Sequence, residues 1–130
     1  MILLDTHVVV WLASGDLRMS RAAQAAIDHS LKSERGLAIS DFTLFELSQL
    51  FRKKRFSLLV SPESFLAEVE KRFVVLPITS NIALQAFELP AGYPKDPADR
   101  IIAATALVEG LSLLTADREI RRARAVRTVW

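Results

Sequence analysis

Four acidic side chains of this chain stand at positions from which they could act together. They are Asp5, Glu46, Asp99 and Asp117. Carboxylates gathered in one place repel each other and raise each other's pKa values. Divalent cations relieve that repulsion, because Mg²⁺ and Mn²⁺ prefer oxygen ligands. A site holding two such ions favours in-line displacement at phosphorus, so the four acids indicate a metal-dependent nuclease.

The first and last of these acids follow predicted strands. Asp5 comes directly after the apolar run 2–4, and Asp117 comes two residues after Thr115, where the run 111–115 ends. In an open parallel sheet, ligands bind beyond the carboxyl ends of the strands, and both aspartates belong to that edge. Taken alone, each aspartate is more simply explained as a helix cap.

The other two acids lie near the starts of predicted helices. Glu46 is in the second turn of the helix 41–54, which is so apolar that this glutamate is either part of a thin polar stripe or a placed ligand. Asp99 is in the first turn of the helix 97–109, where it and Asp96 could simply complement the helix dipole. The right-handed crossover rule brings Asp99 to the same edge of the sheet as the other three acids.

Short apolar strands alternate with helices along the chain, which is typical of an α/β fold. The predicted strands are 2–4, 37–39, 73–76 and 111–115, with 125–129 as a candidate fifth. The predicted helices are one starting at Thr6, then 21–35, 41–54, 62–72, 80–87, 97–109 and 117–124. Ser20 can cap the helix 21–35, and Gly36 can end it. At 130 residues, we expect one doubly wound domain over 1–130.

The composition excludes several classes of protein. With 51% hydrophobic and 25% charged residues, the chain is folded rather than disordered. It has no cysteine, which excludes disulfides, thiolate zinc sites and a cysteine nucleophile. No apolar run reaches the roughly 18–20 residues that span a bilayer, and the N-terminus lacks a basic leader, so we expect a cytoplasmic protein with no membrane partner.

Four motifs, taken in order, resemble the PIN domain family. They are Leu4-Asp5-Thr6-His7, Glu46 between Phe45 and Leu47, Asp96-Pro97-Ala98-Asp99-Arg100 with the alanines that follow it, and Leu113-Leu114-Thr115-Ala116-Asp117. More closely, the chain is similar to the VapC toxins of bacterial toxin–antitoxin pairs. The resemblance covers essentially the whole chain, and the block that begins at Asp96 is its most specific part.

The resemblance implies a PIN-like three-layer α/β/α sandwich with a central, mostly parallel sheet of four to five strands. It implies a Mg²⁺-dependent endoribonuclease, with Mn²⁺ as a substitute, whose catalytic and metal-binding residues are Asp5, Glu46, Asp99 and Asp117. Thr6 and Thr115 match the hydroxyl residues that support such sites. The family further implies an RNA substrate cut to 5′-phosphate and 3′-hydroxyl ends, a homodimer, and a cognate VapB-type antitoxin that holds the enzyme inactive.

Basic residues next to the acids are the candidates for substrate contact. Arg100 follows Asp99 directly, and a second group, Arg118, Arg121, Arg122, Arg124 and Arg127, follows Asp117. RNA needs cations to bring its backbone to an acidic site, although a solvated basic face is the plainer explanation of such a group. The same two explanations apply to Arg52-Lys53-Lys54-Arg55.

Residues around the acids have simpler predicted roles. We expect His7 to serve packing or orientation, and Trp11 to belong to the core. Asp96 precedes a proline, which favours a helix cap. The helix 41–54 is apolar around much of its circumference, which indicates a surface for a second copy or for an antitoxin.

Two rival enzyme classes fail on specific residues. A phosphatase of the haloacid-dehalogenase type needs Asp-x-Asp after the first strand, but His7 takes the second acid's place. A phospho-acceptor domain needs an aspartate at the end of the third strand and a lysine at the end of the last, but the chain has Pro77 and no lysine after Lys95. Two alternatives stay open: a catalytically silent nucleic-acid or partner-binding domain of the same fold, and a non-toxin PIN nuclease.

Overall fold

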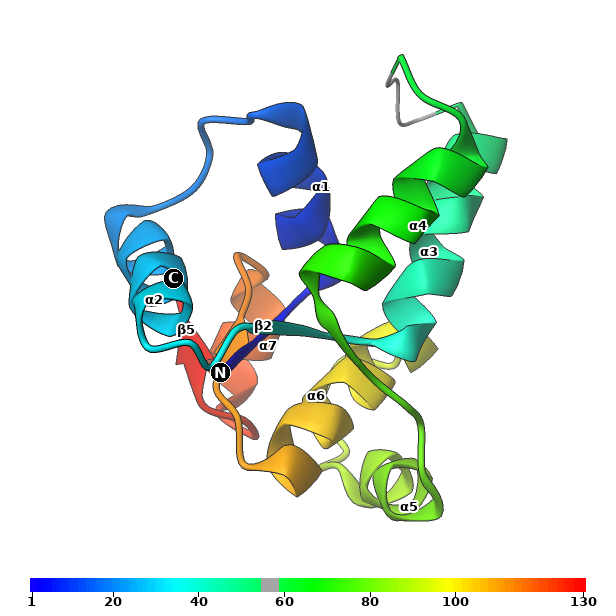
Figure 1. Ribbon diagram of the computed structural model, residues 1–130. Helices are drawn as coiled ribbons and strands as arrows, with labels where there is room; N and C mark the ends of the chain where they lie inside the picture. Colours follow the sequence, from blue (N-terminus) through cyan, green and yellow to red (C-terminus); the bar gives the residue numbers. More distant parts are fainter. Residues whose placement is uncertain (55–58) are drawn as a thin grey trace.

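The computed structural model describes residues 1–54 and 59–130 (Figure 1). The elements in chain order are β1 (Ile2–Leu4), α1 (Thr6–Ser14), α2 (Arg21–Lys32), β2 (Leu37–Ser40), α3 (Asp41–Arg52), α4 (Pro62–Arg72), β3 (Val74–Leu76), α5 (Ser80–Glu88), α6 (Pro97–Glu109), β4 (Leu113–Leu114), α7 (Arg118–Ala123) and β5 (Thr128–Val129). Among these residues, no helix is both long enough and apolar enough to cross a membrane.

The five strands form one parallel sheet in the order β3-β2-β1-β4-β5. In β1, Leu3 is in register with Ala38 of β2 on one side and with Leu113 of β4 on the other. The chain first builds outward from β1 through β2 to β3, and then returns to place β4 on the other side of β1. Ligands of open α/β sheets bind at such a reversal, beyond the carboxyl ends of the strands.

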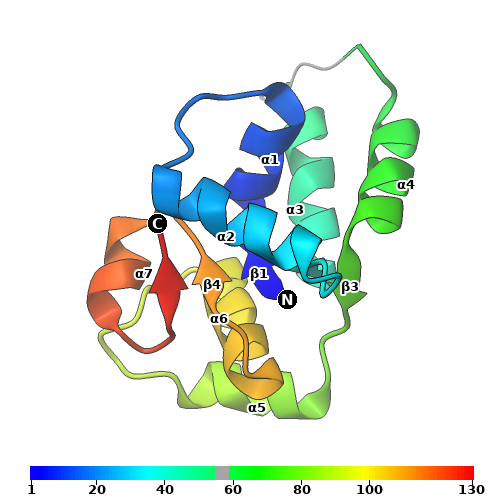
Figure 2. The same cartoon turned by 60° about the vertical axis from the view of Figure 1, so that its left-hand side comes forward.

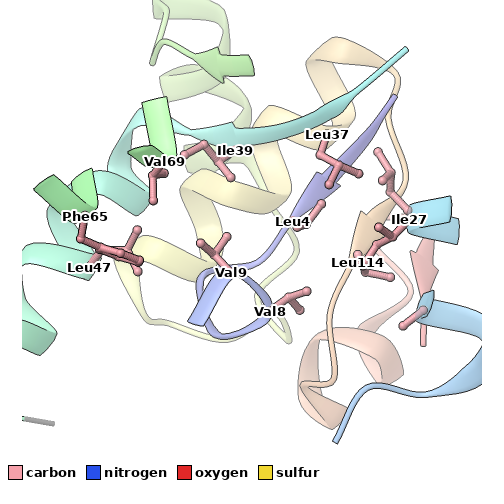
Figure 3. Close-up of a cluster of buried hydrophobic side chains, with 12 residues drawn as sticks. Leu4, Val8, Val9, Ile27, Leu37, Ile39, Leu47, Phe65, Val69 and Leu114 are labelled. Atoms are coloured by element: carbon pink, nitrogen blue, oxygen red, sulfur yellow. The ribbon is translucent and has the colours of Figure 1, made fainter. Parts of the chain in front are cut away.

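Successive residues of each strand point to opposite faces of the sheet, and each face has its own core. Ile2 and Leu4 pack into the core beneath α1, α2, α3 and α4, where Val8, Ile27, Leu47 and Phe65 meet them (Figure 3). Leu3 points into the other core, against Ile102 of α6 and Ile120 of α7. Helix α5 packs on α6 (Figures 1 and 2). This is the α/β/α sandwich with a parallel sheet that the sequence predicts.

Helix α2 ends earlier than the sequence predicts. It stops at Lys32, with Ser33 as its C-cap, rather than at Arg35 before Gly36. Positive φ angles follow at Glu34 (57°) and Gly36 (78°), so the chain leaves the helix and turns within four residues. Gly36 therefore serves the turn into β2, a conformation that costs glycine little.

The last two strands are shorter than predicted. Within the predicted strand 111–115, the backbone N–H of Leu111 donates to Ala106 and closes the end of α6, so the paired residues are only Leu113–Leu114. Within 125–129, β5 covers Thr128–Val129, because the chain first turns at Arg124, where φ is 52°.

Candidate active site

All four predicted acids line one cavity of about 530 Å³. Asp5 follows β1, Glu46 lies in the middle of α3, Asp99 lies in the first turn of α6, and Asp117 follows β4. Residues 112 positions apart in sequence therefore meet where the strand order reverses. The structure brings together every acid that the sequence singles out.

The carboxylate of Asp5 is buried and held at both oxygens. Oδ1 accepts a hydrogen bond from the backbone N–H of Thr6 at 2.8 Å, and so caps α1. Oδ2 accepts one from the hydroxyl of Thr115 at 2.7 Å. The two explanations of Asp5, helix cap and site residue, are therefore compatible, because the bond that caps the helix also aims the side chain.

Two threonines hold Glu46. The hydroxyl of Thr6 donates to Glu46 Oε1 at 2.5 Å and lies 3.1 Å from the hydroxyl of Thr43. Burial raises the pKa of Glu46, the bond from Thr6 opposes that shift, and the nearby carboxylates of Asp5 and Asp96 add to it. Sequence reasoning missed Thr43, although it lies three residues before Glu46 and thus on the same face of α3.

Burial and the neighbouring acids both act on the pKa of Asp99. Burial raises its pKa to about 7, and the negative charges of the carboxylates around it contribute to the shift; they belong to Asp5, Asp96, Asp117 and Glu46. In the part of the chain that the structure describes, no donor forms a hydrogen bond to its carboxylate. Beneath it, the buried Tyr93 donates its hydroxyl to the backbone carbonyl of Asp99 at 3.3 Å. Sequence reasoning missed Tyr93, since nothing in its neighbourhood along the chain marks it.

Asp117 and Asp5 share one anchor. Asp117 caps α7, accepting from the backbone N–H groups of Glu119 at 2.8 Å and Ile120 at 3.1 Å through Oδ1. Its own N–H donates to the hydroxyl of Thr115 at 3.1 Å. Thr115, which is fully buried, therefore fixes both Asp5 and the start of the chain that carries Asp117.

Asp96 caps α6, as the proline after it predicts. Its Oδ1 accepts from the N–H groups of Ala98 at 2.9 Å and Asp99 at 3.2 Å. The side chain nevertheless lines the same cavity as the four acids. Its charge is among those that raise the pKa of Asp99, so a fifth carboxylate contributes to the negative potential of the site.

His7 joins the loop after β4 to the start of α1. Its Nε2 accepts a hydrogen bond from the backbone N–H of Ala116 at 3.0 Å, which places the proton of the neutral ring on Nδ1, 3.5 Å from Asp5 Oδ2. The ring lies edge-on to Trp11 at 4.9 Å between centroids. The imidazole thus orients the segment between Thr115 and Asp117, the kind of role expected from the sequence.

The expectation that Trp11 belongs to the core was wrong. Trp11 is partly exposed and belongs to neither buried cluster. It packs against Trp130 at 5.4 Å, and the guanidinium of Arg18 lies 4.6 Å above its ring. The helical spacing of Trp11 with Val8 misled the prediction, because only Val8 points into the core.

Arg100, a candidate for substrate contact, is held by the chain itself. Its three guanidinium nitrogens donate to the backbone carbonyls of Ala86, Pro94 and Leu89 at 3.2–3.3 Å. The guanidinium also lies 6.0 Å from the centre of the Tyr93 ring. Arg100 therefore fastens the loop before α6, and with it the start of the helix that carries Asp99.

The basic residues after Asp117 gather in a separate hollow. Arg118, Arg121, Arg122 and Arg124 line about 320 Å³ there. Of the other basic cluster, Lys53 lines the acidic cavity and Arg52 and Lys54 are exposed, while Arg55 lies outside the described residues.

The wall of the acidic cavity on α3 is largely apolar. Phe42, Phe45 and Leu50 line it beside Glu46, together with Val10 of α1. Phe45 is 56% exposed, although large aromatic side chains are usually buried. The apolar circumference expected for the helix 41–54 is only partly used by the core, where Leu47 is fully buried.

The residues present fit a divalent cation by their chemistry. Five carboxylates line the cavity and offer oxygen. Burial, and after it the charges of neighbouring carboxylates, raises the pKa values of Glu46 and Asp99, and a cation would stabilise their charged forms. Among the described residues, however, no three acidic or histidine side chains lie close enough to form a ready-made ligand set. An ion would therefore draw the carboxylates inward or be held in part through water, as Mg²⁺ commonly is.

Comparisons with known proteins agree with this fold. The PIN domain family matches residues 2–126. Ribonuclease VapC22 of Mycobacterium tuberculosis is 38% identical, over 99% of this chain and 98% of the relative. DNA-bound VapBC from Salmonella typhimurium is 27% identical, with a TM-score of 0.69 over 98% of this chain and 97% of that one. A toxin–antitoxin complex from Klebsiella pneumoniae shares the fold at 24% identity, with a TM-score of 0.67 over 97% and 95%. The chain is a member of the PIN domain family, of the VapC type.

Proposed function

We propose that this chain, acting as one PIN domain over 1–130, is a metal-dependent endoribonuclease and the toxin of a toxin–antitoxin pair. The observation that carries the proposal is the convergence of Asp5, Glu46, Asp99 and Asp117 on one cavity at the carboxyl edge of the sheet. Its relative VapC22 is named a ribonuclease, and the similar structure from Salmonella typhimurium is a DNA-bound VapBC.

In this proposal, Asp5, Glu46 and Asp99 hold Mg²⁺, or Mn²⁺ in its place, directly or through water, and Asp117 completes or orients the set. The ion supplies activation of water and neutralises charge on the phosphate. A carboxylate of the set accepts the proton of the attacking water. The bond from phosphorus to the 3′ oxygen breaks, and that oxygen takes up a proton from solvent, which leaves a 5′-phosphate and a 3′-hydroxyl.

The chain's own groups position these carboxylates. Thr115 and the backbone N–H of Thr6 hold the two oxygens of Asp5, and the hydroxyl of Thr6 holds Glu46. His7 holds the loop that leads to Asp117. Because these contacts come from the start of α1 and from the segment after β4, the site depends on both being folded at the same edge of the sheet.

The proposed partners follow from the walls of the cavity. A VapB-type antitoxin that blocks the site would place apolar side chains against Phe42, Phe45 and Leu50 and a cationic side chain among the carboxylates. We also propose a homodimer in solution, as in the family that the sequence resembles. Light scattering of the purified chain tests the dimer, since a monomeric mass would contradict it.

RNA cleavage by the purified chain tests the proposed activity. We expect cleavage of single-stranded RNA with Mg²⁺, none with EDTA, and recovery when Mg²⁺ is restored. The variants Asp5→Asn and Asp99→Asn should be inactive, whereas Asp28→Asn, an exposed aspartate on α2, should cleave like the wild type.

Two results would decide against the proposal. Cleavage that persists in EDTA or in both site variants would exclude the metal mechanism. A folded wild type that cleaves none of several RNA classes would favour the silent binding domain instead. Mass spectrometry of the product ends tests the bond that breaks, because 5′-hydroxyl ends would contradict the assignment.

A further inference from the structure

Helix α7 presents arginines on one side and is anchored by the other. Ile120, which is 1% exposed, packs into the core with Val126 of the following segment. Arg118, Arg121 and Arg122 are spaced three and four residues apart and therefore share the outer face of the helix. The exposed arginines thus lie on an element whose position the core fixes.

A fourth arginine turns back toward the same hollow. Arg124 caps α7 in the left-handed conformation, with φ of 52°, and its side chain lines the hollow together with the other three. A left-handed backbone is uncommon for a residue other than glycine. The turn thus brings an additional positive charge to a place that already holds three.

Among the residues that the structure describes, no acidic side chain forms an ion pair with these four guanidinium groups. The arginine ion pairs among residues 1–54 and 59–130 are Arg18 with Asp16 and Arg72 with Glu68. Glu119 of α7 lines a neighbouring hollow with Arg122, without forming an ion pair with it. Four unpaired like charges around one hollow produce a positive potential that favours an anionic partner.

Helix α7 starts at the acidic cavity, because its N-cap, Asp117, lines that cavity, and Arg118 of the hollow is the next residue. The carboxylates of that cavity repel a polyanion, so an RNA that is to reach them needs cations beside them. Guanidinium groups suit this task, because their fork of N–H groups matches the oxygens of a phosphate. Along the helix axis, Arg118 and Arg122 are separated by roughly 6 Å at 1.5 Å per residue, enough to contact more than one phosphate.

We propose that the hollow lined by Arg118, Arg121, Arg122 and Arg124 binds backbone phosphates of RNA adjacent to the one that is cleaved. The inference rests on the proposed ribonuclease function and adds to it the path of the substrate. From the acidic cavity, the RNA strand runs along the outer face of α7. Binding there is independent of base identity, because the arginines meet the backbone.

The test measures RNA binding in a chain that does not cut its ligand. In the Asp99→Asn background, fluorescence anisotropy follows binding of a labelled single-stranded oligouridylate of about ten nucleotides at salt concentrations from about 50 to 200 mM. We compare the double variant Arg121→Ala/Arg122→Ala with Arg21→Ala/Arg35→Ala. Both doubles remove two exposed positive charges, but the second pair does not line the hollow.

We expect the Arg121/Arg122 double to bind the oligonucleotide about tenfold or more weakly than its parent. The slope of log K against log salt concentration should be smaller in magnitude by roughly 1.4, because each phosphate contact on a single strand contributes about 0.7 and two contacts are lost. The Arg21/Arg35 double should keep the slope of the parent. Equal slopes in the two doubles would overturn the proposal. So would an Arg121/Arg122 double that binds RNA like its parent and is impaired only in binding the antitoxin. Cleavage by the wild type is scored separately. Equal slopes together with intact cleavage therefore refute RNA binding at the hollow but not the proposed ribonuclease function.

Discussion

The hydroxyl of Thr115 donates to Asp5 Oδ2 across 2.7 Å, although the two residues are 110 positions apart in the chain. Both are buried, one at the end of β1 and the other just after β4. The pairing of these adjacent strands is therefore what positions the first carboxylate. A change in the register of β4 would misplace Asp5 without touching it.

The first prediction concerns this bond. Thr115→Val keeps the shape of the side chain but removes the donor to Asp5 and the acceptor of the Asp117 N–H. We expect a loss of about 1–3 kcal/mol in the free energy of unfolding, as for a buried polar group left without its partner. Urea denaturation measures it. Thr115→Ser, which retains the hydroxyl, should recover most of the loss, and an unchanged midpoint in Thr115→Val would contradict the role given to the bond.

The second prediction concerns His7. His7→Phe preserves an aromatic ring next to Trp11 but removes the acceptor of the Ala116 N–H. We expect faster hydrogen exchange at the Ala116 amide, together with a lower turnover rate, because the loop to Asp117 is less well held. Exchange measured by NMR reports on that amide directly. Exchange at Ala116 as slow as in the wild type would show that His7 does not hold the loop.

The third prediction concerns the raised pKa of Asp99, which lies at about 7 in the fold. An unfolded chain has an aspartate pKa of about 3.9, so between about pH 4 and 7 the folded state holds a proton that the unfolded state has lost. Without metal, stability therefore falls as the pH rises through this window and levels off above it. Asp99→Asn lacks this penalty.

In the presence of EDTA, Asp99→Asn should be more stable than the wild type at pH 8 and about equally stable at pH 4. We expect the difference at pH 8 to be roughly 1–2 kcal/mol, since the partial exposure of Asp99 to solvent weakens the full effect. Thermal unfolding across that range measures the difference, with Asp28→Asn as the control. A variant that is less stable than the wild type at pH 8 would contradict the crowding of charge assigned to this site.

Much of the fold follows from local pattern. Alternate residues of 2–4 and 37–39 divide between the two cores, and Ser20, Ser61 and Asp96 cap the helices that they precede. The four acids could be proposed because strand ends and helix starts locate the carboxyl edge of a parallel sheet. These are signals of short range, which a single sequence carries in full.

The sequence does not reveal contacts between segments that are separated along the chain. Arg100 faces three carbonyls of the chain between Ala86 and Pro94, and no pattern along the sequence shows that this loop passes over it. Trp11 packs against Trp130, at the other end of the chain, a contact that no local pattern indicates. Thr43 could have been found from its spacing to Glu46, whereas its contact with Thr6 requires the fold.

Binding of Mn²⁺ by the purified chain tests most directly whether the four carboxylates share a metal site. Isothermal titration should show binding to the wild type and to Asp28→Asn with the same affinity, and to Asp99→Asn with an affinity at least about tenfold lower, because a carboxylate oxygen is lost. Equal Mn²⁺ affinity in the wild type and in Asp99→Asn would contradict the assignment of these acids to one metal site.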